Sequence, residues 1–303
     1  MSDSYARGDR SVALLEETIG SNLERTVQRY GGREALVSCS QGLRYSYTEL
    51  DEEVNRLARA LIAAGLDKGE RVGIWSPNCA EWTLVQYATA KIGVILVNIN
   101  PAYRTAELQY ALAQSGCRML IAAPAFRTSD YRAMLAEVRD RLPALERAVF
   151  LEGPDWEELL AGAAEVGAEE LRARSAQLRP EDPINIQYTS GTTGFPKGAT
   201  LTHRNILNNG FFVGGMCRYT SEDRVCIPVP FYHCFGMVMG NLGATTHGAT
   251  MVIPAPAFDP EATLSACADE RCTSLYGVPT MFIAQLGHPR FAEFDLSSLR
   301  TGI

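Results

Sequence analysis

The chain has 303 residues, of which 46% are hydrophobic and 21% are charged, a composition typical of a folded globular protein and not of a disordered or fibrous one. The formal net charge is -7 and the sequence contains no basic run, which excludes a general nucleic-acid-binding surface. The polar N-terminus "MSDSYARGDRS" carries acids and is typical of neither a signal nor a transit peptide, so we expect a cytoplasmic protein.

The cysteines give no sign of a metal site. None of the eight forms a CxxC pair, and none lies at zinc-ligand spacing from the four histidines. We therefore expect scattered, buried and reduced thiols, as in a cytosol, and no metal ligands.

Apolar residues in the first half of the chain alternate between the helical and the strand period. The first expected helix carries Leu23, Val27 and Tyr30 on one face, and a hairpin, "EALVSCS" with "LRYSY", follows it. Thr48 is expected to cap the next helix and Thr105 a later one. The other elements expected before residue 152 are the strands "RVGIW", "VILVN", "RMLIAA" and "RAVFL", the helix "AEWTLVQYATAKIG" and a helix around residues 134–142.

An Ala-, Glu- and Arg-rich segment, residues 153–183, is the predicted connector between two lobes. We expect a flexible N-terminus over residues 1–10, a first α/β lobe over 11–152 and a second α/β lobe over 184–303. Strands are expected in the second lobe at "INIQY", "RVCIPV", "ATMVIP" and "TSLYG". Strands that alternate with helices predict an α/β fold with mixed, largely parallel sheets flanked by helices, and ligands beyond the carboxyl ends of strands.

One long segment lacks charge. No Asp, Glu, Lys or Arg occurs between Arg224 and Asp259. Pro228, Pro230 and several glycines would break any apolar helix of membrane-spanning length. We therefore expect buried protein interior and no transmembrane segment.

The stretch "TSGTTGFPKG" places a flexible, hydroxyl-rich loop after the strand-like "INIQY" and before a helix-like run. Its glycines allow close backbone approach to a ligand, while its hydroxyls and Lys197 supply donors and a positive charge. This pattern predicts a cradle for a polyphosphate, and the alternative is a solvated surface turn. The Walker A pattern does not fit, because Lys197 follows Pro196 and precedes Gly198.

The longer stretch "YTSGTTGFPKGATLTHRNI" resembles the phosphate-loop signature of the adenylate-forming (AMP-binding) superfamily, which comprises acyl-CoA synthetases, luciferases and peptide-synthetase adenylation domains. Three further stretches match this superfamily: "PVPFYHCFG", "NINPAYRTAELQYALAQSG" and "LYGVPTMF". The last two, together with "LRTGI", most resemble medium-chain fatty acyl-CoA ligases. The resemblance covers nearly the whole chain from about residue 11 and implies the N-terminal domain of the adenylate-forming fold.

The resemblance implies ATP-dependent activation of a fatty acid, with a medium chain favoured, to an acyl-adenylate and then to acyl-CoA. Fatty acid, ATP and coenzyme A would be the small-molecule partners, with Mg²⁺ as the metal cofactor, and a homo-oligomer is left open. Two alternatives remain: adenylation with transfer to a carrier protein, and a fragment that binds nucleotide or acyl groups without turnover.

The resemblance also implies roles for individual residues. The loop would hold the β- and γ-phosphates of ATP with Thr189, Ser190, Gly191, Thr192, Thr193, Gly194, Phe195, Pro196 and Lys197. His233 matches a position beside the bound carboxylate and is the catalytic-site candidate, with a role in acyl positioning; the alternative is a packed core histidine. Tyr276, Gly277 and Val278 match a strand end that lines the acyl pocket.

For each of two further sets of residues, the sequence allows two interpretations. The glycines at 236, 240 and 243 would make room for an aliphatic tail or allow close helix packing. His203 and Arg204 would contribute to the site or form a solvated first turn of the following helix.

In this superfamily the adenine-contacting turn, the acidic Mg²⁺ ligand, the ribose-binding Asp and a lid domain with a catalytic Lys follow the position of Ile303. The resemblance therefore implies a truncated second lobe without the lid domain. We expect the 303-residue chain alone to be inactive.

Overall fold

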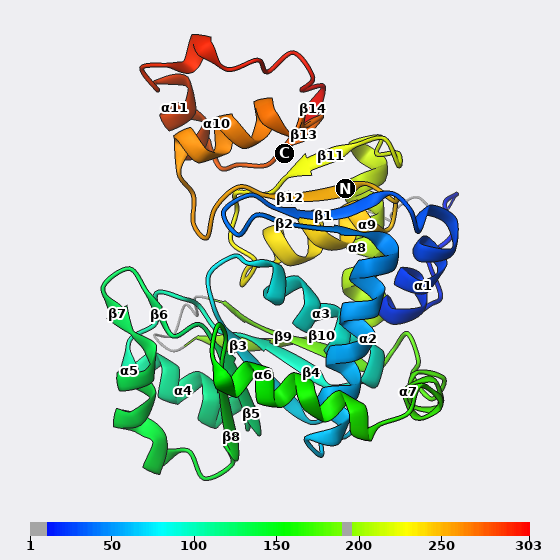
Figure 1. Ribbon diagram of the computed structural model, residues 1–303, viewed down its shortest axis with the longest axis vertical. Coiled ribbons are helices and arrows are strands. Elements are labelled where there is room, and N and C mark those ends of the chain that lie inside the picture. Colours follow the sequence, from blue (N-terminus) through cyan, green and yellow to red (C-terminus); the bar gives the residue numbers. More distant parts are fainter. Residues whose placement is uncertain (1–10, 190–195) are drawn as a thin grey trace, which may run out of the picture.

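The computed structural model describes residues 11–189 and 196–303 and contains two six-stranded sheets flanked by helices. The predicted flexible N-terminus, residues 1–10, lies outside the described residues. In Figure 1 the two sheets lie one above the other, with α3 (Ala80–Ile92) between them. The predicted α/β fold with mixed, largely parallel sheets is confirmed.

The first sheet has the order β14-β13-β11-β12-β1-β2. All its neighbours are parallel except the N-terminal hairpin of β1 and β2, which the sequence predicted. Its strands are β1 (Glu34–Ser38), β2 (Leu43–Ser46), β11 (Arg224–Cys226), β12 (Thr250–Ile253), β13 (Ser274–Leu275) and β14 (Thr301–Gly302).

The second sheet has the order β10-β9-β4-β3-β5-β8, and only the β9–β10 pair is antiparallel. The sequence did not predict β10, because its Gly- and Thr-rich residues are typical of a loop and only pairing with β9 makes them a strand. The strands are β3 (Arg71–Trp75), β4 (Ile95–Asn98), β5 (Met119–Ala122), β8 (Arg147–Phe150), β9 (Pro183–Thr189) and β10 (Lys197–Thr202). A short separate hairpin consists of β6 (Ala125–Phe126) and β7 (Ser129–Asp130).

Helices flank both sheets, and α3 lies in the space between the two sheets (Figure 1). Every residue of α3 except Glu81 is buried, which explains why its sequence is apolar on all sides. The other helices are α1 (Ile19–Tyr30), α2 (Tyr47–Ala63), α4 (Thr105–Ser115), α5 (Tyr131–Val138), α6 (Pro154–Ala161), α7 (Ala168–Ser175), α8 (His203–Met216), α9 (Gly243–Thr245), α10 (Pro260–Asp269) and α11 (Pro279–Leu286). Three short 3₁₀ helices are η1 (Arg139–Arg141), η2 (Gly162–Glu165) and η4 (Phe291–Glu293). One π-helix, η3, spans Phe235–Leu242.

Two predicted helix caps are wrong by one or two residues. Helix α2 is capped by Ser46 and not by Thr48, because the Ser46 hydroxyl accepts from Glu49 N–H while the Glu49 carboxylate accepts from Ser46 N–H. Helix α4 begins at Thr105, so Arg104 is the cap residue, and its N–H donates to the Glu107 carboxylate. In both cases the acid in the first turn was the overlooked signal.

The predicted connector, residues 153–183, contains two regular helices. Helices α6 and α7 pack against α2 and bury Trp156, Leu159 and Leu171. Both sheets take strands from both sides of this segment, since β1 and β2 join β12, and β9 joins β4.

The charge-free segment that follows Arg224 lies in the interior, as predicted. Val225, Ile227, Val229 and Phe231 are fully buried, and they belong to the main hydrophobic core. Among the described residues, no helix combines the length and the hydropathy that crossing a bilayer requires.

Candidate functional site

The segment Pro228–Gly236 leaves the carboxyl end of β11 and runs across the space between the two sheets. A cavity of about 240 Å³ opens beside it. The cavity is lined by residues that follow the carboxyl ends of strands in both sheets: Pro77, Asn78, Asn100, Pro101, Ala102, Phe126, Arg127, Pro228, Pro230, Tyr232, Pro256, Ala257, Phe258 and Met281. This is the location at which ligands bind in α/β folds.

One amide, just past the end of β3, holds the first part of this segment. The Asn78 side chain donates to Val229 O at 2.9 Å and accepts from Phe231 N–H at 2.8 Å. Asn78 is 3% exposed, so both backbone groups find their partner where water is excluded. The single side chain therefore fixes the path of the backbone over three residues.

Two further amides, at the ends of β4 and β9, hold the carbonyl of Tyr232. Asn98 Nδ2 donates to this oxygen at 3.1 Å, and Gln187 Nε2 donates to it as well. Asn98 also donates to Gln187 Oε1 at 3.2 Å and accepts from Asn185 Nδ2 at 2.8 Å. All three amide side chains are buried. We call Asn78, Asn98 and Gln187 the amide clamp, because they attach a segment of one sheet to strands of the other.

His233 follows the clamped carbonyl directly and is exposed. Its Nδ1 accepts from the N–H of Phe235 at 3.1 Å, which leaves Nε2 as the ring nitrogen that faces outward to a ligand. The alternative of a packed core histidine is wrong for this residue. The assignment of His233 as the acyl-positioning residue stays a prediction.

Tyr276 lies against the far end of the same segment. Its ring stacks on Phe235, and its buried hydroxyl accepts from Tyr219 OH at 3.1 Å and donates to Met239 O at 3.0 Å. Burial raises the pKa of Tyr276 well above its ordinary value, so the phenol stays protonated and can donate.

Gly277 and Val278 continue this strand end. A side chain at Gly277 would meet the ring of Phe282 at 3.1 Å, and its N–H donates to Ile303 O at 2.8 Å. Val278 caps α11 and is 39% exposed. The structure therefore brings Tyr276 and His233 onto neighbouring segments, whereas Gly277 contacts Phe282 of α11 and Ile303, and Val278 caps α11.

The predicted phosphate loop connects β9 to β10. Thr189 and Lys197 are opposite each other in the antiparallel register, and both are exposed. Ser190, Gly191, Thr192, Thr193, Gly194 and Phe195 lie outside the described residues. Because Gln187 of the amide clamp lies two residues before Thr189, the base of the loop and the Pro228–Gly236 segment share one attachment point.

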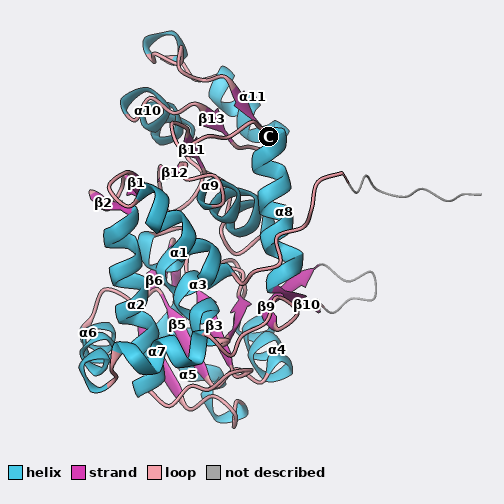
Figure 2. Ribbon diagram, turned by 90° about the vertical axis from the view of Figure 1, so that its right-hand side faces the viewer, coloured by secondary structure: helices cyan, strands magenta, loops and turns pink. Residues whose placement is uncertain are grey.

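Helix α4, from the matching stretch "NINPAYRTAELQYALAQSG", contacts the same hairpin. Tyr110 OH donates to Pro196 O at 3.1 Å, and Tyr188 OH donates to Ala111 O at 3.0 Å. The Tyr110 and Tyr188 rings meet edge to face, with centroids 6.5 Å apart. Figure 2 shows α4 beneath the hairpin and α8 rising from it. Thus the stretches that carry the resemblance lie around one site.

Gly236 and Gly240 in η3, and Gly243 at the start of α9, lie at close packing contacts. A side chain at Gly236 would meet Pro230 O at 2.5 Å, and one at Gly240 would meet Ile227 at 2.9 Å. Gly243 lies 3.4 Å, at its built Cβ position, from Gly210 O in α8. This geometry favours the packing interpretation over room for an aliphatic tail.

The first turn of α8 is not solvated at His203. This side chain is fully buried, its Nδ1 accepts from Ile19 N–H at 3.2 Å, and its Nε2 has no partner among the described residues. Burial lowers the pKa of His203 to about 4. Arg204 is partly exposed and pairs with Glu16 and Glu181. The solvated-turn interpretation is therefore wrong for His203, whereas Arg204 is partly exposed in that turn.

Residues 11–189 and 196–303 bring together one group of side chains that could hold a metal ion. The one group of three His, Cys, Asp or Glu side chains close enough to share an ion there is Cys226, Cys267 and Cys272. No set of oxygen ligands for Mg²⁺ is assembled by this part of the chain.

The sequence patterns predicted neither the amide clamp nor the cysteine group. Asn98 and Gln187 terminate or nearly terminate buried strands, and a polar residue at such a position is the signal that was available. For the cysteines, part of a signal was available, because Cys267 and Cys272 are separated by four residues, within the C-x2–4-C spacing of metal ligands. Cys226 lies far from both in the sequence and could not be joined to them.

The family model described as AMP-binding enzyme matches residues 23–303. A mitochondrial medium-chain acyl-CoA ligase of Danio rerio is 40% identical over 323 residues, which cover 100% of this chain and 53% of that protein. The chain thus spans about half the length of the curated relatives it matches.

Solved structures agree in fold. The inhibitor-bound N-terminal domain of FACL13 from Mycobacterium tuberculosis superposes with a TM-score of 0.81 at 26% identity, covering 94% of this chain and 69% of that one. An anthranilate CoA ligase in complex with anthranoyl-AMP gives a TM-score of 0.84 at 26% identity and covers 95% of this chain and 55% of that one.

Proposed function

Because the chain belongs to the AMP-binding enzyme family, we propose that the whole protein is an AMP-forming acyl-CoA ligase that activates a fatty acid, with a medium-chain acid as the preferred substrate. One observation carries the proposal: the amide clamp holds the Pro228–Gly236 segment and the base of the β9–β10 hairpin to one another. A carboxylate near His233 would then lie beside a phosphate held by the hairpin. The 40% identity to a medium-chain acyl-CoA ligase supports the substrate class.

The proposed reaction has two steps. The fatty-acid carboxylate attacks the α-phosphorus of ATP and displaces pyrophosphate, and the thiol of coenzyme A then attacks the acyl-adenylate and displaces AMP. Two anions approach in the first step, so donors that face the phosphates lower the barrier. Lys197, exposed at the start of β10, and the hydroxyl of Thr189 are the described groups that would supply this stabilisation.

His233 would position the acyl carboxylate. Its Nδ1 is already engaged with Phe235 N–H, so Nε2 is the ring atom available to a ligand. The fixed backbone on both sides of it limits the movement of the ring, which is what positioning requires. Tyr276, stacked on Phe235, would form part of the wall behind it.

The described residues assemble no ligand set for Mg²⁺. It enters the proposal with ATP, as its usual counter-ion. The compartment is also a proposal: we retain the cytoplasm, although the Danio rerio relative is named as mitochondrial.

The test uses the full-length protein with ATP, coenzyme A and saturated fatty acids of increasing length. We expect AMP, pyrophosphate and acyl-CoA in equal amounts, with the highest kcat/KM for octanoate or a near neighbour. ADP and phosphate as products would contradict adenylation. Exchange of pyrophosphate without acyl-CoA would favour a carrier protein as the acceptor.

The 303-residue chain is assayed in parallel with the full-length protein. Here we expect no pyrophosphate exchange with octanoate, because positioning of the nucleotide needs groups on both of its sides. Robust exchange would contradict this expectation while leaving the proposed activity of the full-length protein in place.

A further inference from the structure

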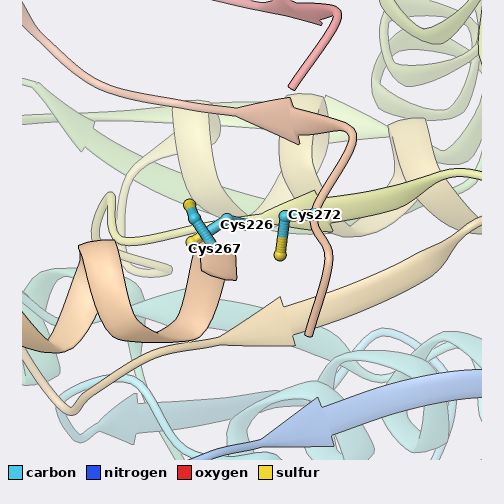
Figure 3. A group of neighbouring side chains, drawn as sticks. All are labelled: Cys226, Cys267 and Cys272. Atoms are coloured by element: carbon cyan, nitrogen blue, oxygen red, sulfur yellow. The ribbon is translucent and has the colours of Figure 1, made fainter. Parts of the chain in front are cut away.

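Three cysteines from three separate elements come together in the upper part of the fold. Cys226 ends β11, Cys267 lies in the last turn of α10, and Cys272 precedes β13 (Figure 3). Their Sγ atoms all lie within 4.8 Å of one another. All three residues are fully buried, and all three are free thiols.

The surroundings of this cysteine cluster are apolar. It belongs to a small hydrophobic core of its own, formed with Val37, Val252, Ala266, Leu275 and, partly buried, Phe282, Leu296 and Leu299. The charge of Arg224 acts on the Cys272 thiol, but its guanidinium already pairs with Glu34 and Glu270, both at 2.5 Å. The charge of Arg224 is therefore already balanced by two carboxylates and is not free to balance an anionic complex at the cluster.

The spacing suits a ligand that binds three sulfur atoms. Bonds of about 2.3 Å from one central atom place three sulfur atoms roughly 3.5–4 Å apart. The observed upper limit of 4.8 Å lies within about 1 Å of that range, a change that side-chain rotation can provide. Three thiols on different elements can thus close around one atom without any change in the fold.

The net charge of the complex determines which central atom suits the three thiolates. Three thiolates with Zn²⁺ leave a net charge of -1, and with Cu⁺ a net charge of -2. Either charge would be buried in an apolar core with no partner, which is strongly unfavourable. A trivalent thiophilic element leaves no charge. Soft thiolate ligands also favour such an element over hard cations.

We propose that Cys226, Cys267 and Cys272 form a trithiol site for trivalent arsenic. Arsenous acid, As(OH)₃, exchanges its three As–O bonds for three As–S bonds. Each thiol proton leaves with one hydroxide as water, so that three water molecules are released and no electron is transferred. The product is neutral and matches the apolar surroundings. It links β11, α10 and the turn before β13, and this inference does not rest on the proposed function.

The test measures arsenic retained by the purified, reduced protein after incubation with sodium arsenite and desalting. We expect one arsenic atom per chain and an arsenic K-edge absorption spectrum with three sulfur neighbours and no oxygen neighbour. Retention of no arsenic, or a spectrum with oxygen neighbours, would overturn the proposal. Both readouts use the unmodified protein and do not depend on the folding of any variant.

Variants locate the site. Cys226→Ala, Cys267→Ala and Cys272→Ala should each weaken arsenite binding by at least about tenfold, because one of the three soft ligands is lost. Cys117→Ala, at a buried cysteine outside the cluster, and Cys39→Ala, at an exposed one, should bind as the wild type does. Equal binding by the Cys226 variant and the wild type would place the arsenic elsewhere. Tighter retention of Zn²⁺ or Cu⁺ than of arsenic would overturn the charge argument.

Discussion

The ring of Phe235 stacks on the ring of Tyr276, with centroids 5.4 Å apart and an interplanar angle of 26°. Phe235 opens the π-helix η3 directly after the His233 segment, and Tyr276 follows β13. A π-helix leaves backbone carbonyls outside the regular α-helical pattern, and one of them, Met239 O, accepts the Tyr276 hydroxyl. The ring contact and this hydrogen bond together hold the two segments at a fixed separation.

Replacement of Tyr276 by Phe should destabilise the protein while it keeps the ring contact. The substitution leaves Met239 O without this donor and the buried Tyr219 OH without this acceptor. We expect the free energy of unfolding to decrease by about 1–3 kcal/mol, measured by urea denaturation. Tyr45→Phe is the control, since its half-buried hydroxyl forms no hydrogen bond with any described residue. Equal losses in both variants would contradict the role of the hydrogen bonds.

Local sequence patterns predicted most of the helices and strands. The apolar runs "VILVN" and "RVGIW" are strands because their residues suit a sheet that is buried on both faces. These strands can be predicted from the local sequence, without knowledge of contacts to distant residues. The capping residues were missed by one or two positions where an acid in the first turn shifted the cap to Ser46 or Arg104.

The contacts between residues that are distant in the sequence could not be predicted from it. Strand β10 has the composition of a loop and is a strand only because β9 lies beside it. Asn78, Asn98 and Gln187 are ordinary polar residues until the two sheets bring their amides to the same backbone segment. The cysteine cluster depends in the same way on the parallel pairing of β11 with β13. Local patterns therefore identified the elements and the motifs, whereas the contacts between them required the fold.

The amide clamp gives a second prediction. In Asn78→Ala, Val229 O and Phe231 N–H lose their buried partner, so we expect the free energy of unfolding to fall by about 2 kcal/mol or more. In the full-length protein the KM for the fatty acid should rise more than the KM for ATP, because the acyl segment is the one released. Arg127→Ala is the control: Arg127 lines the same cavity but is exposed, and its guanidinium lies over the Phe126 ring. A loss in the control as large as in Asn78→Ala would show that the cavity wall, and not the clamp, is responsible.

The β9–β10 hairpin gives a third prediction. Lys197→Ala, and Thr192→Ala in the part of the loop outside the described residues, should each slow adenylation by the full-length protein by about 10²-fold, because each removes a donor that faces developing charge. The melting temperature of the Lys197 variant should stay unchanged, since the Lys197 side chain is exposed. Pyrophosphate exchange measures the rate. The control is Lys68→Ala, which removes a lysine charge from an ion pair with Asp182. Near-normal exchange in the Lys197 and Thr192 variants would contradict the phosphate-cradle role.

The last prediction concerns His203 and pH. Burial is the main cause that lowers the pKa of His203 to about 4 from an ordinary value of 6.5, while the nearby Asp182 opposes the shift. The folded state therefore favours the neutral ring, whose Nδ1 accepts from Ile19 N–H. Below pH 6.5 the unfolded chain binds a proton that the folded chain does not, so stability decreases as the pH falls to about 4. A shift of this size corresponds to a loss of about 3 kcal/mol. His203→Gln keeps an acceptor for Ile19 N–H but cannot titrate, so urea denaturation between pH 7 and pH 4 should show a shallower decrease in stability for this variant. Parallel pH profiles for wild type and variant would show that protonation of His203 does not limit stability in acid.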